Sequence, residues 1–290
     1  MNVLITGANG FLGSALAEKF YNLDYKVNLL VRSESNLDRL NNHIANYNLF
    51  KFSNEIELRN ALIKINPDLI IHTVCNYGRN KENVLEIFDT NYRLGLLILN
   101  EIIANGKKIF FINIGTILPP ENSLYSFSKN QFSELGKYIS KNFNNINFKN
   151  ILLQHMYGPG DDESKFTSYV INSCIRNVQE VNLTSGEQFR DFIYIKDVTD
   201  AIAIVCKNIL DIKSEDIEIG SGNLISIKEF ALKSHELSNS ITKLNFGAIK
   251  YNNYQQDMPA SNLQILNSFN WKPKYSLEMA LAEIIKIETK

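Results

Sequence analysis

The sequence predicts an α/β fold in which a doubly wound parallel sheet is followed by a smaller C-terminal lobe. Short apolar runs alternate with helical patterns through the first half of the 290-residue chain, and this alternation is typical of right-handed βαβ units. Runs such as LIIHTV and IFFINI lack polar alternation, as expected of strands that are covered on both faces. Beyond residue 160 this regular alternation ends, and the sequence predicts short strands and separate helices.

Each expected element rests on a local pattern. Apolar runs predict strands at Asn2–Thr6, Lys26–Val31, Leu49–Phe52, Leu69–Val74, Ile109–Ile114 and Phe148–Leu153. Helical periodicity predicts helices at Phe11–Phe20, Asn36–Asn41, Glu55–Ile65, Asn83–Ala104 and Leu124–Phe143, and later near Phe166–Arg176, Val198–Asn208, Ile227–Leu237 and Leu277–Ile287. We expect residues 1–155 to form the first domain, with 190–210 returning to it, and residues 156–290 to form mainly the smaller lobe.

Composition excludes several classes of protein. The net charge is −1, so the chain has no excess of positive charge that would attract nucleic acid or an anionic membrane. The three cysteines, Cys75, Cys174 and Cys206, are far apart and form no CxxC pair, which predicts neither a disulfide framework nor a metal site. The N-terminus has no signal-peptide pattern, and no apolar segment has the length of a bilayer span. We therefore expect a cytoplasmic protein.

The turn after the first predicted strand is typical of a dinucleotide-binding loop. Residues 6–13 read TGANGFLG and lie between a strand and a helix. Gly7 permits a tight turn, Gly10 lets the backbone approach a pyrophosphate, and Gly13 allows close packing of helix and sheet. The N-terminus of the helix supplies N–H groups and a partial positive charge for phosphates. This context predicts a dinucleotide-binding domain of the Rossmann type.

The end of the second predicted strand bears on the choice of dinucleotide. An NAD-binding domain usually carries Asp or Glu there, to bond the ribose 2′-hydroxyl. Here the strand ends Val31-Arg32-Ser33, and the first carboxylate is Glu34. Arg32 can pair with a 2′-phosphate and Ser33 can donate to it. This favours NADP(H) over NAD(H), with the alternative that Arg32 is a solvated surface residue and NAD(H) is used.

A hydroxyl residue and a Tyr-x-x-x-Lys pair form the candidate catalytic group. Tyr125 and Lys129 lie one helical turn apart, and Thr116 follows the fifth predicted strand. We expect the Lys129 ammonium to lower the pKa of the Tyr125 phenol, so that the phenol can exchange a proton with a carbonyl or alcohol oxygen. Thr116 can hold the same oxygen. The alternative is that Tyr125 merely packs.

Together these motifs resemble the extended short-chain dehydrogenase/reductases, the NAD-dependent epimerase/dehydratase family, over nearly the whole chain. Further matching segments are HTVC, NYRLG, HMYGPG, RDFIYIKDV and WKPKYSLEMAL. Within that family the chain is similar to the CDP-paratose and CDP-abequose synthases, through CNYGRN, FINIGTILPPENSLYSFSK, GDDESKFTSYVI, LTSGEQFRDFIYIKDV and LNFGAI. The resemblance implies reduction of the C4 ketone of CDP-4-keto-3,6-dideoxyglucose by NADPH, for surface polysaccharide such as the O-antigen of lipopolysaccharide.

The resemblance also implies roles for individual residues. Those implied to contact the cofactor are Gly7, Asn9, Gly10, Phe11, Leu12, Gly13, Arg32, Val74, Tyr125, Lys129 and His155. Those implied to contact the nucleotide-sugar substrate are Thr116, Tyr77, Arg79, Lys165 and Arg190. Arg190 matches an arginine that binds the sugar-nucleotide diphosphate, and its alternative is a salt bridge with Asp191 or Asp197. Tyr77, Arg79 and Lys165 have the alternative of being solvated loop residues.

Departures from the family pattern narrow the implied activity. Ile117 and Leu118 stand where the 4,6-dehydratases carry Asp-Glu, which disfavours dehydration. Cys75 is interpreted as a packing residue, His72 as a buried structural residue, and His155 as a replacement for Asn. Alternatives that stay open are a nucleotide-sugar 4-epimerase with tightly bound NAD, another 4-keto-6-deoxysugar reductase, and a non-enzymatic NADP-binding regulator. The two long apolar helices suggest a homodimer.

Overall fold

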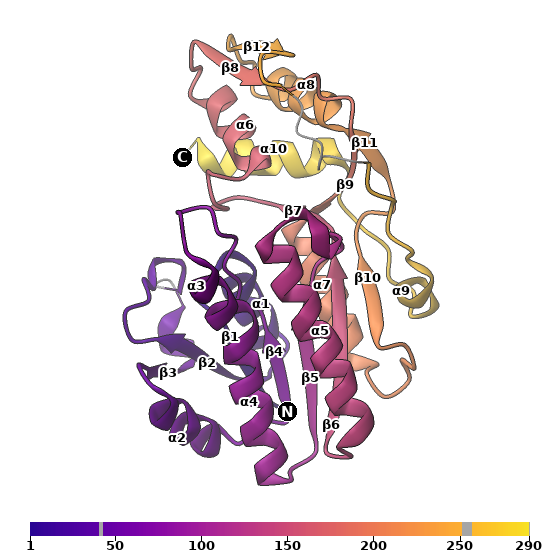
Figure 1. Ribbon diagram of the computed structural model, residues 1–290. Helices are drawn as coiled ribbons and strands as arrows, with labels where there is room; N and C mark the ends of the chain where they lie inside the picture. The colour runs from indigo at the N-terminus through magenta and orange to yellow at the C-terminus, as the bar shows by residue number, and fades with distance from the viewer. Residues whose placement is uncertain (41–42, 251–256, 290) are drawn as a thin grey trace. The chain divides into compact units, whose positions relative to one another are not determined.

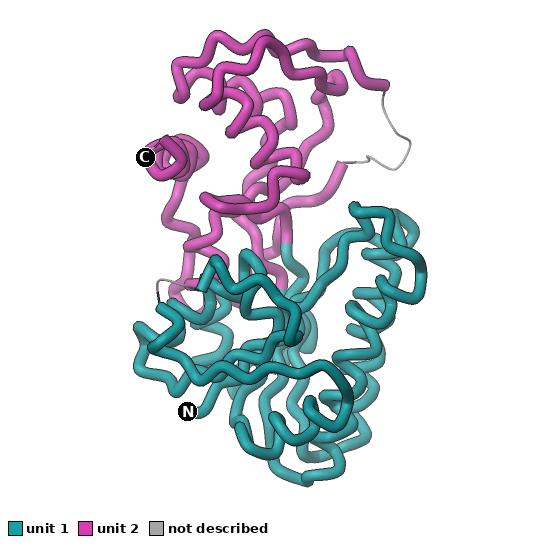
Figure 2. Tube along the Cα trace, turned by 90° about the vertical axis from the view of Figure 1, so that its left-hand side faces the viewer, with its two compact units in different colours: residues 1–153, 202–217 teal, residues 154–201, 218–290 magenta. Residues whose placement is uncertain are grey.

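The computed structural model describes residues 1–40, 43–250 and 257–289, and the chain divides into two compact units. Unit 1 consists of residues 1–153 and 202–217, and unit 2 of residues 154–201 and 218–290 (Figure 2). No helix within the described ranges is both long and apolar enough to cross a membrane.

Unit 1 is built on a seven-stranded sheet with the strand order β10-β6-β5-β4-β1-β2-β3 (Figure 1). The strands are β1 (Asn2–Thr6), β2 (Lys26–Arg32), β3 (Asn48–Phe52), β4 (Leu69–His72), β5 (Ile109–Ile114), β6 (Ile146–Leu153) and β10 (Asp216–Ile219). The pairs from β6 to β3 are all parallel. The predicted doubly wound α/β fold is therefore confirmed, and each predicted strand agrees with an observed strand to within two residues.

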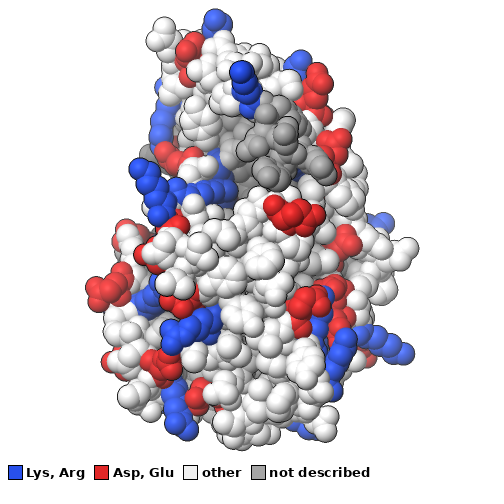
Figure 3. Space-filling view, in the orientation of Figure 1, with Lys and Arg blue, Asp and Glu red and all other residues white. Residues whose placement is uncertain are grey.

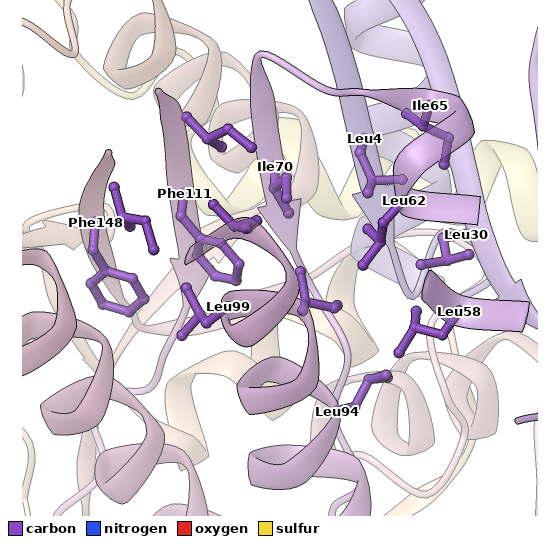
Figure 4. Packing of buried hydrophobic residues seen from close by; sticks show 14 of the residues in the cluster. Leu4, Leu30, Leu58, Leu62, Ile65, Ile70, Leu94, Leu99, Phe111 and Phe148 are labelled. Atoms are coloured by element: carbon purple, nitrogen blue, oxygen red, sulfur yellow. The ribbon is translucent and has the colours of Figure 1, made fainter. Parts of the chain in front are cut away.

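Helices cover both faces of this sheet. In Figure 1, α4 (Leu94–Asn105) and α5 (Leu124–Asn142) lie side by side in front of it, whereas α1 (Phe11–Tyr21) and α7 (Ile195–Lys207) lie behind it. A further helix, α2 (Glu55–Ile65), packs beside α4. One apolar cluster fills the space between the strands and the helices α2, α4 and α5, and Figure 4 shows Leu99 of α4 close to Phe111 of β5.

Close backbone approach explains two glycines in the helices of unit 1. A Cβ atom on Gly95 of α4 would lie 2.3 Å from the Phe132 ring, and one on Gly136 of α5 would lie 2.2 Å from the Phe148 ring. Because interiors are packed to crystal-like density, only glycine lets these helices lie so near the aromatic side chains. The position of α5 matters for function, since this helix carries the Tyr-x-x-x-Lys pair.

The predicted single helix at Asn83–Ala104 is wrong in one respect. The structure has α3 (Val84–Phe88), a π-helical turn at Asp89–Arg93, and then α4. The π turn inserts an extra residue into the helix and places the Asn91 side chain in the interior, where it is fully buried. Such single turns occur often at functional sites, and their cause is tertiary contact rather than helical propensity.

Unit 2 contains two small sheets and their helices. The strands β7 (His155–Tyr157), β9 (Phe189–Tyr194) and β11 (Leu224–Ser226) form one sheet, and β8 (Glu180–Leu183) pairs with β12 (Lys243–Phe246). The helices are α6 (Phe166–Ile175), α8 (Ile227–Leu237), α9 (Gln264–Ser268) and α10 (Leu277–Glu288). The predicted stretch at Asn36–Asn41 is only a 3₁₀ turn at Asp38–Leu40 in unit 1, and Asn41 lies outside the described residues.

Candidate active site

The glycine-rich turn after β1 has the compact shape that the sequence predicts. Gly7 has φ +69°, and a Cβ atom there would lie 2.9 Å from the Thr73 hydroxyl and 3.0 Å from the Val74 nitrogen. A Cβ atom on Gly13 would lie 2.2 Å from the Gly7 carbonyl oxygen. Gly10 donates its N–H to that oxygen at 2.9 Å and caps α1 without a side chain. The turn is thus a backbone cradle at the positive end of a helix, which suits a pyrophosphate.

Arg32 ends β2 at the same edge of the sheet. Its side chain is exposed, and its guanidinium donates to the Thr90 hydroxyl at 2.8 Å. Ser33 accepts a hydrogen bond from the Ser53 hydroxyl at 2.7 Å. Thr90 belongs to the π-helical turn, so the same irregularity that buries Asn91 also supplies a support for Arg32. A guanidinium held in this way can present its other N–H groups to a phosphate.

Asn91 ties the segment after β4 to α5. Its side-chain oxygen accepts the Asn76 N–H at 2.6 Å, and its amide nitrogen donates to the Asn76 carbonyl and to the Ser128 hydroxyl, each at 2.9 Å. Ser128 in turn donates to the Tyr125 carbonyl at 2.9 Å. The motif match at NYRLG identifies Asn91, but only the structure shows that this residue supports α5, the helix of the Tyr-x-x-x-Lys pair.

The residues of the candidate catalytic group meet in unit 1. The hydroxyls of Thr116 and Tyr77 lie close enough to the half-buried Tyr125 phenol to lower its pKa. Thr116 follows β5, and its hydroxyl also accepts the Leu118 N–H at 3.2 Å. The ring centroids of Tyr77 and Tyr125 are 4.7 Å apart, and the Arg79 guanidinium lies 4.8 Å from the Tyr77 centroid. The structure therefore places Tyr77 and Arg79 beside the phenol.

Lys129 connects α5 to the glycine-rich turn after β1. It is 1% exposed, and its ammonium donates to the Val74 carbonyl at 3.3 Å. Val74 is also the residue against which Gly7 packs. Burial lowers the pKa of Lys129 to about 8, because an ammonium loses hydration in the interior. Negative phosphates near the turn would act in the opposite direction and favour the protonated form.

The expected net lowering of the Tyr125 pKa is wrong for the protein as described, because burial outweighs the favourable charges. Burial raises the pKa of Tyr125 above its ordinary value, and the Cys75 thiol adds to this rise. Contacts with Thr116, Arg79 and Tyr77 oppose it. The sequence argument counted the charge of Lys129 but not the loss of hydration around the phenol. The phenol is therefore neutral at pH 7, which is the form that donates a proton.

The sequence interpretation of Cys75 differs from its exposure in the structure, whereas the interpretation of His72 agrees with its burial. Cys75, interpreted as a packing residue, is exposed and lies near enough to Tyr125 to affect its pKa. His72 is fully buried in β4, accepts or donates a hydrogen bond with the Thr6 hydroxyl at 2.7 Å, and has a pKa lowered to about 3 by burial. Its structural role agrees with the interpretation from the sequence.

The remaining predicted site residues lie together in unit 2. Burial lowers the pKa of His155 to about 4, and the positive charges of Arg190 and Lys165 lower it further. The nitrogen Nδ1 of His155 is buried without a hydrogen-bond partner among the described residues. Lys165 pairs with Asp161 at 2.9 Å, and the buried Arg190 donates to the Phe189 carbonyl at 2.7 Å. This is a cationic cluster of a kind that suits phosphate oxygens.

The two carboxylates named as alternative partners of Arg190 have structural roles. Asp191 accepts the backbone N–H groups of Ser221, Gly222 and Ser261 at 2.6 to 3.0 Å. Asp197 accepts those of Lys274 and Tyr275 at 3.0 and 3.1 Å. These bonds fix loops of unit 2, which explains why both carboxylates are buried.

Comparison with known proteins identifies the family of the chain. A model of the NAD dependent epimerase/dehydratase family matches residues 3–220. The CDP-abequose synthase of Salmonella typhimurium is 30% identical, covering 98% of this chain and 97% of that protein, and the one of Salmonella muenchen is 27% identical, covering 99% and 97%. The solved UDP-glucose 4-epimerase of Thermus thermophilus with NAD shares the fold, with a TM-score of 0.85, 17% identity, and coverage of 99% and 98%. The chain therefore belongs to the NAD dependent epimerase/dehydratase family.

Proposed function

We propose that the protein is an NADPH-dependent 4-ketoreductase acting on a nucleotide-activated deoxyhexulose. The favoured substrate is CDP-4-keto-3,6-dideoxyglucose, and the product is CDP-paratose or CDP-abequose. The observation that carries the proposal is the proximity of the Thr116 and Tyr125 hydroxyls, with Lys129 one helical turn along α5. Relatives named CDP-abequose synthase, 26 to 30% identical over nearly the whole chain, support the sugar class.

The chain's own residues perform acid catalysis on the ketone. Tyr125 donates its phenolic proton to the C4 oxygen as negative charge develops there, and the Thr116 hydroxyl holds that oxygen in place. The buried Lys129 ammonium lies on the same helix and stabilises the phenolate that remains. NADPH, when bound, supplies the hydride. Ile117 and Leu118 follow Thr116 and bring no acid or base to the sugar, so this site reduces without eliminating water.

Residues of unit 1 fit NADPH at two places. The cradle formed by Gly7, Gly10 and Gly13 accepts a pyrophosphate, because side chains at these positions would collide with the backbone or with Val74. Arg32 lies at the carboxyl end of β2 with Ser33 after it, where the adenosine ribose of a dinucleotide sits in such a sheet. We propose that Arg32 pairs with the 2′-phosphate.

We expect Arg32→Glu to raise the Michaelis constant for NADPH at least tenfold and to change that for NADH far less. The substitution replaces a guanidinium with a carboxylate, which repels the 2′-phosphate and can bond a free 2′-hydroxyl. Steady-state kinetics with both cofactors measure the effect. Lys26→Glu is the matched control, since Lys26 is exposed at the opposite end of β2. Equal changes for NADPH and NADH would rule out the assignment.

The substrate class is tested with a panel of CDP-, dTDP-, GDP- and UDP-4-keto sugars. We expect NADPH oxidation to be fastest with the CDP-linked 3,6-dideoxyhexulose, and NMR of the product then distinguishes paratose from abequose by the configuration at C4. Purified protein that carries tightly bound NAD and consumes no NADPH would favour a 4-epimerase instead.

We also propose that the protein is a homodimer that pairs through α4 and α5. These helices and the residue that follows α5 expose several large apolar side chains, namely Leu96, Leu124, Phe127, Tyr138 and Phe143. The face of unit 1 that they form is largely free of charge (Figure 3). An exposed apolar patch of this kind marks an interaction surface. Light scattering after size exclusion should give twice the chain mass of 33.1 kDa, and a monomer would contradict the proposal.

A further inference from the structure

The segment after β4 holds an aromatic side chain against the catalytic phenol. Tyr77 stacks on Tyr125 with ring centroids 4.7 Å apart and planes inclined by 37°. Two contacts fix this segment: Asn91 bonds both backbone groups of Asn76, and the Asn76 side chain accepts the Gly78 N–H at 2.9 Å. Tyr77 is therefore placed by the backbone on either side of it, rather than by its own packing alone.

With the two rings in contact, the Tyr77 hydroxyl lies close enough to the Tyr125 phenol to lower its pKa. The Tyr125 oxygen thus has Thr116 and Tyr77 as neighbours, and the two have different positions in the fold. Thr116 follows β5, where the substrate oxygen is proposed to lie, whereas Tyr77 belongs to the segment after β4. A phenol that has lost its proton accepts hydrogen bonds strongly, so a second hydroxyl beside it is suited to stabilise the ionised form.

A positive charge reinforces this contact. The Arg79 guanidinium lies 4.8 Å from the centroid of the Tyr77 ring, within the range of a cation–π interaction. The Cys75 thiol, from the same segment, also acts on the pKa of Tyr125, and Lys129 lies one helical turn along the helix that carries Tyr125. Burial and the Cys75 thiol raise the pKa of Tyr125, while Thr116, Arg79 and Tyr77 lower it.

We propose that Tyr77 and Arg79 are positioning residues that hold Tyr125 and stabilise its phenolate during proton donation. When Tyr125 gives its proton to the C4 oxygen, the Tyr77 hydroxyl donates a hydrogen bond to the phenolate and keeps its own proton. Arg79 holds the Tyr77 ring and supplies positive charge. Solvent returns the proton to Tyr125 after the product leaves. The identity of the proton acceptor rests on the proposed ketoreductase function, but the contact among the three side chains does not.

The test replaces single groups and measures the ionisation of residue 125 directly. Tyr77→Phe keeps the stacked ring and removes only the hydroxyl. Arg79→Gln removes the charge of an exposed side chain, and Arg79→Lys restores it. Incorporating 3,5-difluorotyrosine at position 125 lowers the phenol pKa into the range where proteins stay folded and allows its titration by ¹⁹F NMR. Tyr92→Phe is the matched control, because Tyr92 packs on Phe132 and not on Tyr125.

We expect Tyr77→Phe to raise the pKa of the fluorinated phenol by about 1 unit, as loss of a hydrogen bond to a charged group implies. Arg79→Gln should raise it less, Arg79→Lys should restore it, and Tyr92→Phe should leave it unchanged. An unchanged pKa in Tyr77→Phe would overturn the proposal.

Kinetics separate positioning from substrate binding. We expect Tyr77→Phe to lower kcat about tenfold, to shift the basic limb of the pH profile upward, and to leave KM for the sugar nearly constant. A raised KM at constant kcat would show that Tyr77 binds substrate instead. The NMR titration needs no substrate, so it distinguishes the two proposals. If no keto sugar is reduced while Tyr77→Phe still raises the pKa, the ketoreductase function fails and the positioning role stands.

Discussion

Tyr125→Phe should lower kcat for ketone reduction by about three orders of magnitude, in the range typical of a lost general acid. The phenyl ring retains the stacking on Tyr77 but has no proton to give and no hydroxyl to share with Thr116. NADPH should still bind, because the glycine cradle and Arg32 lie outside the change. Stopped-flow measurement of single-turnover NADPH oxidation checks the rate, and fluorescence titration checks cofactor binding.

A matched control for this substitution is available on the same helix. Tyr138 of α5 is 64% exposed, and Tyr138→Phe should leave kcat unchanged. If Tyr125→Phe retained more than about a tenth of the normal turnover, the phenol would not be the proton donor. The proposed role of Thr116 as its partner would then also be wrong.

Lys129→Met should have two opposite effects. It should lower kcat/KM by at least about a hundredfold, because the cation beside the cofactor turn is lost. It should also raise the free energy of unfolding of the cofactor-free protein. Burial lowers the pKa of Lys129 from 10.5 to about 8, which corresponds to a penalty of about 3 kcal/mol for keeping the ammonium charged. Loss of the bond to Val74 offsets about 1 kcal/mol of the gain, leaving about 2 kcal/mol.

The pH dependence of this stabilisation has a definite sign. Below about pH 8 the ammonium is charged in both the folded and the unfolded chain, so the whole penalty is present. As the pH rises toward 10.5 the folded protein loses this proton first, and the difference between Lys129→Met and the unmodified protein shrinks. Urea denaturation at pH 7 and pH 10 measures it. Lys141→Met, at the exposed end of α5, is the control, and a variant less stable than the parent at pH 7 would contradict the account.

Local patterns predict most of the fold because they reflect burial along single elements. The buried runs from β1 to β6 and the stripes of α2 and α5 lie where periodicity places them. The π turn at Asp89–Arg93 could not be predicted in this way. It depends on bonds from Asn91 to Asn76 and Ser128, which are separated from it by 15 and 37 residues. The sequence likewise does not predict strand β10, because these four residues form a strand only through their pairing with β6.

In the candidate site, too, local motifs can be predicted from the sequence, whereas tertiary contacts cannot. Motif spacing predicts the group of Tyr125, Lys129 and Thr116, and the structure places Thr116 near enough to Tyr125 to lower the pKa of the phenol. The ionisation of the phenol is a property of its surroundings, so motif spacing predicts the wrong direction for its pKa. The contacts of Tyr77 and Arg79 with Tyr125 depend on how the segment after β4 folds, and no spacing along the chain reveals them.

Transfer of deuterium from cofactor to sugar tests the central claim most directly. NADPH deuterated at C4 on the transferred face is incubated with CDP-4-keto-3,6-dideoxyglucose, and the product is examined by NMR. The account predicts one deuterium at C4 of the sugar for each NADPH oxidised, and none with Tyr125→Phe over the same time. A product without deuterium, formed with no net oxidation of NADPH, would contradict it.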